Sequence, residues 1–192
     1  WSCLWTINTS RDEELLDLAK KSGCDHVNMG IENVGQESIS SIHKLQNPVQ
    51  EYEELLGRLT ARGLFYSLNF MFGLDADKPE IFEETLAFLE RVKAPMAFFN
   101  VATPRRGTPM WDQLQAEGRV HNPEAERYLG MICNFYPRHM TPEECERIDA
   151  AVAEMADEGL RVLGVASAHF AVGEELPPEQ HDFDFDFLGL VG

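Results

Sequence analysis

The chain has 192 residues, 44% of them hydrophobic, which predicts a substantial core and argues against wholesale disorder. Its formal net charge of −17 repels phosphate backbones, so we expect no nucleic-acid partner, and no apolar run is long enough to cross a bilayer. The four cysteines show no C-x-x-C spacing, so no metal or cluster site is expected from them. Reduced thiols and a cytoplasmic location follow as expectations. Because the chain starts at Trp1, inside an apolar stretch and without Met, we expect a fragment.

The first elements in the chain are a strand and a helix. Residues 3–7 have a short strand pattern, and Ser10 to Glu13 form a capping box that would open a helix. Gly23 is expected to end that helix. The residues predicted to face inward are Leu15, Leu18 and Ala19.

The alternation continues with strands predicted at 26–32, 64–72 and 96–102. Asp77 is expected to cap the helix between the last two strands. The apolar stripes of the two intervening helices are Val49, Tyr52, Leu55, Leu56 and Leu59, and then Phe82, Leu86 and Leu89. Strands that alternate with helices predict parallel βαβ units, with the functional loops after the strands at 30–32, 73–77 and 103–109.

The pattern changes after Pro109. A short helix is expected at 110–116, followed by irregular chain to residue 140. Thr141 to Glu144 opens a new helix that Gly159 would close. Its inward residues would be Ile148, Val152 and Met155, and two strand-like stretches follow at 161–166 and 183–191. Residues 141–192 hold 13 acidic and 2 basic side chains, and this break in composition hints at a second unit.

Several motifs of residues 1–140 occur in an order that resembles radical S-adenosylmethionine (radical SAM) enzymes, in particular the group that often carries a cobalamin-binding domain. They are Ser22-Gly-Cys24, Met29-Gly-Ile-Glu32, Ile42-His-Lys44, Phe70-Met-Phe-Gly-Leu-Asp75, Phe82-Glu-Glu-Thr85, Gly107-Thr-Pro109 and Glu117-Gly-Arg119. The resemblance implies an α/β fold, a partial (β/α) barrel that begins near the third strand and lacks its N-terminal half. It also implies S-adenosylmethionine and a [4Fe–4S] cluster in the parent protein, with cobalamin possible.

The resemblance further assigns cofactor-binding positions. Glu32, with Gly30 beside it, matches the glutamate that helps hold the ribose or amino-acid part of S-adenosylmethionine. Gly73 matches the glycine that lets the adenine approach the backbone, and the end of the last strand, with Asn100 and Thr103, would line the adenine side. No residue is assigned as catalytic or as a metal ligand.

Two departures from the family pattern stand out. The cluster motif C-x-x-x-C-x-x-C is absent, so the chain as given is expected to be inactive. Arg105 and Arg106 replace the apolar residues usual before Gly107, which leaves the substrate side open.

The tail resembles a different family. Residues 155–166 and 185–192 are similar to the end of the nucleotide-binding domain of P-type cation-transporting ATPases, where Arg161 would match an arginine that reaches an ATP phosphate. This predicts two units, 1–140 and 141–192, with a small α+β segment in the second and a junction between Phe135 and Glu146. The alternatives are therefore a fragment of a P-type ATPase that binds ATP, or a non-catalytic composite chain.

Some residues admit both a functional and a structural interpretation. Asp75 and Asp77 could be a metal pair, although Asp77 is more simply a helix N-cap. Arg105 and Arg106 could clamp an anion or lie in a solvated loop. The same choice between ligand and solvated surface holds for Arg161 and for the alternating set Asp182, Asp184 and Asp186.

Overall fold

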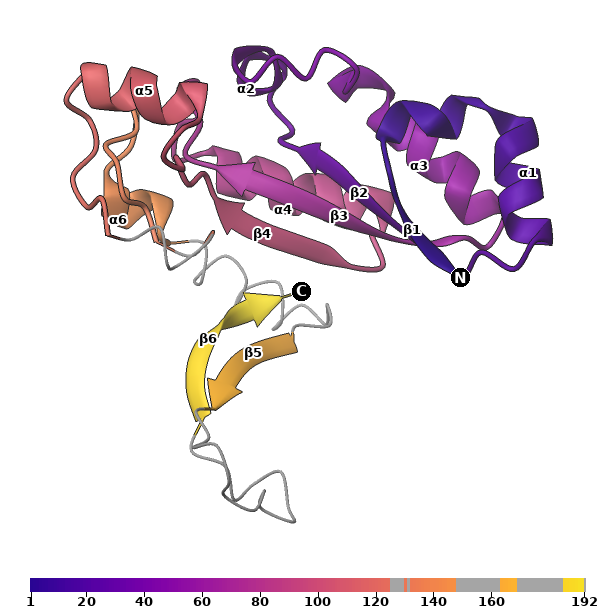
Figure 1. Ribbon diagram of the computed structural model, residues 1–192. Helices are drawn as coiled ribbons and strands as arrows, with labels where there is room; N and C mark the ends of the chain where they lie inside the picture. The colour runs from indigo at the N-terminus through magenta and orange to yellow at the C-terminus, as the bar shows by residue number, and fades with distance from the viewer. Residues whose placement is uncertain (125–129, 131, 148–162, 169–184, 192) are drawn as a thin grey trace.

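The computed structural model describes residues 1–124, 130, 132–147, 163–168 and 185–191 (Figure 1). A four-stranded parallel sheet has the order β1-β2-β3-β4. Its strands are β1 (Ser2–Trp5), β2 (His26–Glu32), β3 (Phe65–Phe72) and β4 (Ala97–Val101). The predicted strands are thus confirmed, with ends that move by one or two residues.

Helices α1 (Glu13–Lys21), α3 (Tyr52–Ala61) and α4 (Ile81–Val92) connect successive strands and cover one face of the sheet (Figure 1). Short 3-10 helices precede α1 (Ile7–Arg11) and α3 (Val49–Glu51). Helices α2 (Gln36–Ser41), α5 (Pro109–Ala116) and α6 (Pro142–Cys145) lie at the end of the sheet to which the strands point. The predicted βαβ pattern and the predicted helix after Pro109 are confirmed.

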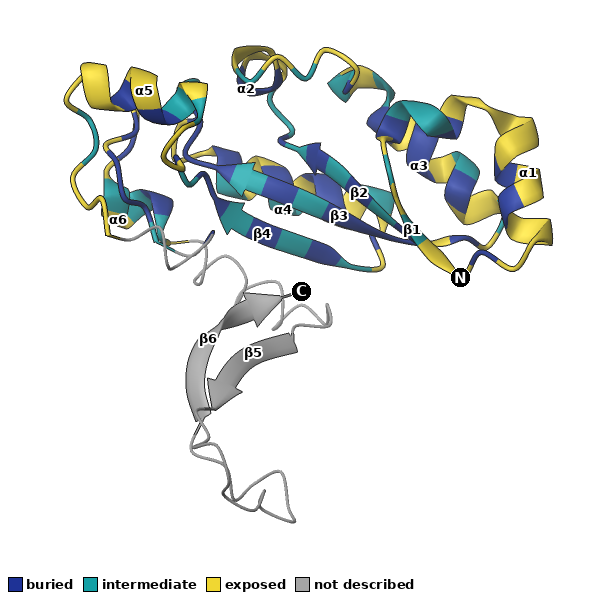
Figure 2. Cartoon of the chain, in the orientation of Figure 1, coloured by how far each residue is buried: buried dark blue, intermediate teal, exposed yellow. Residues whose placement is uncertain are grey.

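Buried and partly buried residues alternate along β2 and β4 (Figure 2). On β2, Val27, Met29 and Ile31 are fully buried on the helix-covered face, whereas Asn28 and Glu32 are only partly buried. A strand projects successive residues to opposite faces, so the polar set shares the other, inner face of the sheet.

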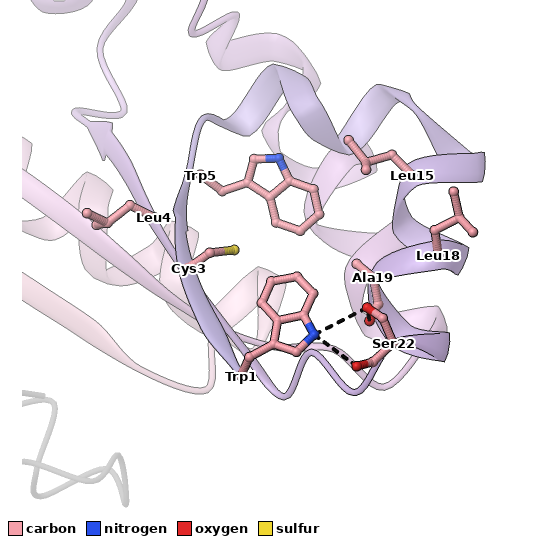
Figure 3. A pocket seen from close by; sticks show the side chains of 8 residues that line it. All are labelled: Trp1, Cys3, Leu4, Trp5, Leu15, Leu18, Ala19 and Ser22. Carbon is pink, nitrogen blue, oxygen red and sulfur yellow. Dashed lines mark hydrogen bonds between the residues drawn. The ribbon is translucent and has the colours of Figure 1, made fainter.

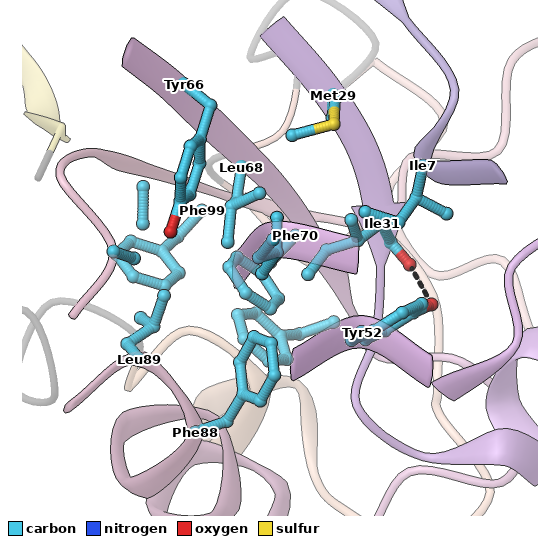
Figure 4. Close-up of a cluster of buried hydrophobic side chains, with 14 of the residues drawn as sticks. Ile7, Met29, Ile31, Tyr52, Tyr66, Leu68, Phe70, Phe88, Leu89 and Phe99 are labelled. Carbon is cyan, nitrogen blue, oxygen red and sulfur yellow. Dashed lines mark hydrogen bonds between the residues drawn. The ribbon is translucent and has the colours of Figure 1, made fainter. Parts of the chain in front are cut away.

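Aromatic rings fill the space between sheet and helices (Figure 4). Phe70 is fully buried and stacks on Phe72 and Phe99, with ring centroids 6.3 and 5.6 Å apart. Tyr52 meets Phe88 edge to face at 6.0 Å. Burial of these rings supplies the main hydrophobic stabilisation of the unit.

The predictions for the first helix are partly wrong. Asp12, not Ser10, caps α1 by accepting a hydrogen bond from the Leu15 N–H at 2.9 Å. The cause is the 3-10 helix between β1 and α1, which shifts the helix start by two residues. The helix therefore buries Leu16 and Ala19, while Leu15 and Leu18 are 40% and 54% exposed.

The other two stripes agree better with their predictions. In α3, the buried residues are Tyr52, Leu55, Leu56 and Leu59, while Val49 is partly buried in the preceding 3-10 helix. In α4, Leu89 is buried as predicted, and Phe82 and Leu86 are partly buried against the core. The helix also buries Ile81, Thr85 and Phe88.

The C-terminal part contains a second, two-stranded sheet. Strands β5 (Leu163–Ala168) and β6 (Phe185–Val191) pair antiparallel. The capping box at Thr141 and Glu144 is present at the start of α6, as predicted. Ile148, Val152, Met155, Gly159, Arg161, Asp182 and Asp184 lie outside the described residues, and the boundary at residue 140 stays a prediction.

Among the residues that the structure describes, no helix is long and apolar enough to cross a membrane.

The stacked rings give a first prediction. Phe70→Ala should lower the free energy of unfolding by about 3–5 kcal/mol, because it removes a fully buried ring and leaves a cavity. Phe65→Ala, at a strand end where the ring is 41% exposed, should cost less than about 1 kcal/mol. Urea unfolding of both variants measures the difference. Equal losses would show that the stacked rings are not the centre of the core.

Candidate functional site

The loop after β2 begins with an unusual backbone conformation at Glu32. This residue has a φ of 67°, a region that non-glycine residues rarely adopt, and the β2–β3 register shifts between Gly30 and Glu32. The Lys44 ammonium group donates a hydrogen bond to Glu32 Oε1. A side chain on Gly30 would clash with that same carboxylate oxygen, so the glycine makes room for the ion pair.

Neighbouring side chains hold this bulge in place. Asn47 Nδ2 donates to the carbonyls of Gly30 and Ile31 at 2.9 and 3.2 Å, and the Tyr52 hydroxyl donates to the Ile31 carbonyl at 3.0 Å. Burial, and next the negative charge of Glu32, raise the pKa of Tyr52, so its phenol remains a donor. The strained conformation is thus fixed by three hydrogen bonds to two carbonyls.

Asp77 joins the loops that follow β2 and β3. The carboxylate is 1% exposed and accepts hydrogen bonds from Asn33 Nδ2 and the Leu74 N–H, both at 3.0 Å, and from the Ser38 hydroxyl. Burial raises its pKa, and these hydrogen bonds offset part of that effect. The predicted role of Asp77 as helix N-cap is therefore wrong: the turn after β3 directs the carboxylate back toward Leu74, and Glu80 occupies the N-cap of α4.

Asp75 faces a different set of partners. Its carboxylate accepts from Arg119 Nη2 at 2.6 Å and from Arg138 Nε at 2.9 Å, and both arginines also pair with Glu117. The two aspartates consequently do not form a metal pair, and the described residues contain no group of three His, Cys, Asp or Glu placed to bind a metal ion. Glu117 and Arg119 belong to the motif Glu117-Gly-Arg119 noted in the sequence, whereas no local sequence feature marks Arg138 as a partner of Asp75.

Gly73 directly follows β3 and has a φ of 86°. A Cβ there would lie 2.8 Å from Cys145 Sγ and 3.5 Å from Phe135 Cζ, so chain packing alone requires a glycine. Contact between the backbone of Gly73 and an adenine ring stays a prediction.

Asn100 and Thr103 lie together at the end of β4. Asn100 Nδ2 donates to the Phe70 carbonyl at 3.3 Å, and Thr103 Oγ1 accepts from the Gly130 N–H at 3.1 Å. Their role at the adenine site also stays a prediction. In the loop that follows, Arg106 lies over the Trp111 ring, 5.4 Å from its centroid.

A separate apolar pocket of about 430 Å³ lies between β1 and α1 (Figure 3). The Trp1 indole ring forms one wall of this pocket. Its N–H holds the ring in place by donating to the Ser22 carbonyl and hydroxyl at 3.0 and 3.2 Å. The lining residues are Trp1, Cys3, Leu4, Trp5, Leu15, Leu18, Ala19 and Ser22. Leu15 and Leu18, predicted to face the core, line this pocket instead.

No family model matches the chain. It is 26% identical over 144 residues to bacteriochlorophyllide d C-12(1)-methyltransferase of Chlorobaculum tepidum, 29% over 132 residues to hopanoid C-2 methylase of Rhodopseudomonas palustris, and 30% over 121 residues to anaerobic magnesium-protoporphyrin IX monomethyl ester cyclase of Cereibacter sphaeroides. These matches cover 75%, 68% and 60% of this chain but 31%, 25% and 20% of the relatives. The chain thus spans between a fifth and a third of their length.

Two solved structures share the fold. The radical SAM methyltransferase TsrM from Kitasatospora setae, with cobalamin and a [4Fe–4S] cluster bound, superposes with a TM-score of 0.53 at 20% identity, over 60% of this chain and 21% of that one. Coproporphyrinogen III oxidase (HemN) from Escherichia coli, a radical SAM enzyme, gives 0.56 at 16% identity, over 82% of this chain and 32% of that one. The predicted fold class is confirmed: an α/β arrangement with four parallel strands, matching part of a radical SAM barrel.

The resemblance of residues 141–192 to P-type ATPases gains no support. The relatives and structures above are methyltransferases, a cyclase and an oxidase. The ATP assignment rested on Arg161, which lies outside the described residues.

The Asp75 network predicts a pH dependence. Partial burial would raise the pKa of Asp75, but hydrogen bonds from Arg119 and Arg138 outweigh it and hold the pKa below its ordinary value of 3.8. A lowered folded-state pKa stabilises the fold above the ordinary value, and that contribution is lost as the pH falls through the lowered one. Asp75→Asn should therefore be less stable than the parent chain at pH ~7, with the gap narrowing as the pH falls below the ordinary value of 3.8.

Urea unfolding at pH ~7 and at several pH values below 3.8 measures the gap. Asp25→Asn is the control. That side chain also pairs with a cation, the terminal amine at 3.7 Å, but it is 81% exposed, so its charge should contribute little. A gap for Asp75→Asn that stayed constant with pH would show that the carboxylate charge does not stabilise this loop.

Proposed function

We propose that the chain is part of a radical SAM enzyme and that its strand-end loops bind S-adenosylmethionine. The observation that carries the proposal is the ion pair of Glu32 and Lys44, held beside Gly30 by a backbone bulge at the carboxyl end of β2. In parallel α/β folds, binding sites lie at this end of the sheet. The sequence relatives and the shared fold support the family assignment.

The charges of this ion pair complement the ligand. The amino-acid part of S-adenosylmethionine carries an ammonium and a carboxylate, which a carboxylate–ammonium pair can bind in exchange for its internal contact. Glu32 would accept from the ligand ammonium group, and Lys44 would donate to the ligand carboxylate. Both side chains are partly exposed, at 16% and 38%, so ligand atoms can reach them.

Adenine and ribose would then extend toward the ends of β3 and β4. Gly73 would offer backbone groups, and Asn100 and Thr103 would offer an amide and a hydroxyl. When bound to a reduced cluster, S-adenosylmethionine supplies the radical that starts the family's chemistry. The residues present do not fit that cluster, because the three-cysteine motif is absent and the described residues bring no three ligands together.

We infer that the rest of the barrel belongs to a longer protein. The outer edge of β1 has no paired strand among the described residues, and its Leu4 side chain is 86% exposed. The adjoining apolar pocket offers Trp1 and Leu18, which are each 54% exposed, as further contact surface (Figure 3). Additional strands and helices of the same barrel would cover both features. Cobalamin dependence and the cytoplasmic location stay predictions.

Ligand binding tests the site directly. Addition of S-adenosylmethionine to the 192-residue chain should shift the amide NMR signals of Gly30, Glu32 and Lys44. Glu32→Gln should weaken this binding about tenfold, because it replaces a charge-assisted hydrogen bond with a neutral one. Glu37→Gln, an exposed change in α2, should leave it unaltered. If the two variants titrated alike, Glu32 would have no role in binding.

The cluster prediction is separate. Anaerobic reconstitution of this chain with iron and sulfide should give no stable charge-transfer absorbance near ~400 nm, because three thiolates cannot converge. The predicted inactivity of the chain follows from the same lack of three converging thiolates. A stable absorbance that survived desalting would contradict both predictions.

A further inference from the structure

A tight turn of the backbone sets the direction of the Glu32 carboxylate. The Asn33 N–H donates to the Ile31 carbonyl at 2.8 Å, which closes a three-residue turn centred on Glu32. With a φ of 67° at its central residue, this is the rare and strained form of such a turn. It persists only where neighbouring contacts hold both of its ends. Asn47 and Tyr52 hold the end that precedes Glu32 through their hydrogen bonds to the Ile31 carbonyl.

The Asn33 side chain holds the other end of the turn. It is fully buried, and both of its polar atoms have partners. The amide oxygen accepts from the Gly35 N–H at 2.7 Å, whereas Nδ2 donates to the Met71 carbonyl at 3.3 Å and to Asp77 Oδ1 at 3.0 Å. Met71 belongs to β3, and Asp77 lies in the loop that follows this strand. The residue after Glu32 is therefore anchored to the neighbouring strand and its loop.

Asp77 fixes the orientation of the Asn33 amide. Its Oδ2 accepts from the Leu74 N–H at 3.0 Å, and its Oδ1 accepts from the Asn33 amide and the Ser38 hydroxyl. The carboxylate is 1% exposed, so its rotation would leave buried donors without acceptors, at a cost in free energy. Asn33 is consequently held in one orientation, and it holds the turn at Glu32 in place.

We propose that Asn33, held by Asp77, is a positioning residue of the proposed binding site. It keeps Glu32 in the strained turn, from which the carboxylate meets the Lys44 ammonium group and would meet the ammonium group of S-adenosylmethionine. Asn33 thus acts through Glu32 and not on the ligand itself. The ligand part of this inference rests on the proposed function, whereas the hold on the turn does not.

Two single variants break the pair in opposite ways. Asn33→Asp places one buried carboxylate against another, and Asp77→Asn replaces an acceptor with a donor that faces other donors. In each ligand-free variant, the strong NOE between the amide proton and Hα of Glu32, which a positive φ produces, should disappear. The Kd for S-adenosylmethionine should rise about tenfold. Because the two changes shift the net charge in opposite directions, a loss common to both is not an effect of charge.

The exchange variant Asn33→Asp/Asp77→Asn restores the pair with donor and acceptor reversed, at the net charge of the parent chain. The new amide donates to the new carboxylate, while its oxygen still accepts from the Leu74 N–H. The NOE within Glu32 should return, and the Kd should lie within about threefold of the parent value. An exchange variant that is folded by circular dichroism, yet lacks the NOE and binds about tenfold more weakly, would overturn the positioning role.

A double-mutant cycle separates positioning from a general loosening of the fold. If Asn33 and Asp77 act through Glu32, Asp77→Asn should weaken binding about tenfold in the parent chain but less than about twofold in a chain that already carries Glu32→Gln. Losses that simply add would overturn the positioning role. A parent chain that does not bind S-adenosylmethionine would overturn the proposed function and the ligand part of this inference. The NOE measurements, made without ligand, would still decide whether Asn33 holds the turn.

Discussion

The buried carboxylate of Asp77 is the interaction on which the strand-end loops depend. It accepts hydrogen bonds from Asn33 and Ser38 in the segment after β2 and from the Leu74 backbone after β3. A buried carboxylate is costly unless such donors surround it, and here donors from both loops converge on it. The position of Glu32, just before Asn33, is thereby fixed relative to Gly73. Removal of this acceptor would leave buried donors unpaired in both loops at once.

The strained backbone conformation at Glu32 is held by the contacts around the bulge. A positive φ costs free energy in a non-glycine residue, and it persists where surrounding contacts require it. Asn47 and Tyr52 satisfy the displaced carbonyls of the bulge, and Lys44 neutralises the carboxylate. The charged pair is therefore preorganised at the carboxyl end of β2, so the proposed ligand would meet little cost of ordering there.

The sequence predicted the strands and helices because their periodicities record burial directly. Alternation in β2 and the apolar stripe of α3 both survived in the structure. Polar roles were harder to predict, because an acidic residue before a helix can cap it or turn back to a loop, as Asp77 does. Ser10 is not the N-cap of α1, because it lies within the 3-10 helix that precedes α1. Contacts such as Arg138 with Asp75 join residues 63 positions apart and have no local signature.

The two faces of the sheet differ in the residues that they carry and in how these residues are satisfied. Helices bury the outer face, whereas the inner face carries amides that bond across strands: Asn69 donates to the Asn28 side chain and to the Met29 carbonyl at 3.1 Å. An inner face whose polar groups pair with each other needs no second apolar layer to avoid unsatisfied hydrogen bonds. The hydrophobic stabilisation of the unit thus comes from the helix-covered face, and the inner face and its strand ends carry the polar groups to which the proposed ligand would bind. The Glu32–Lys44 pair lies at the carboxyl end of β2, where the apolar core borders the polar inner face.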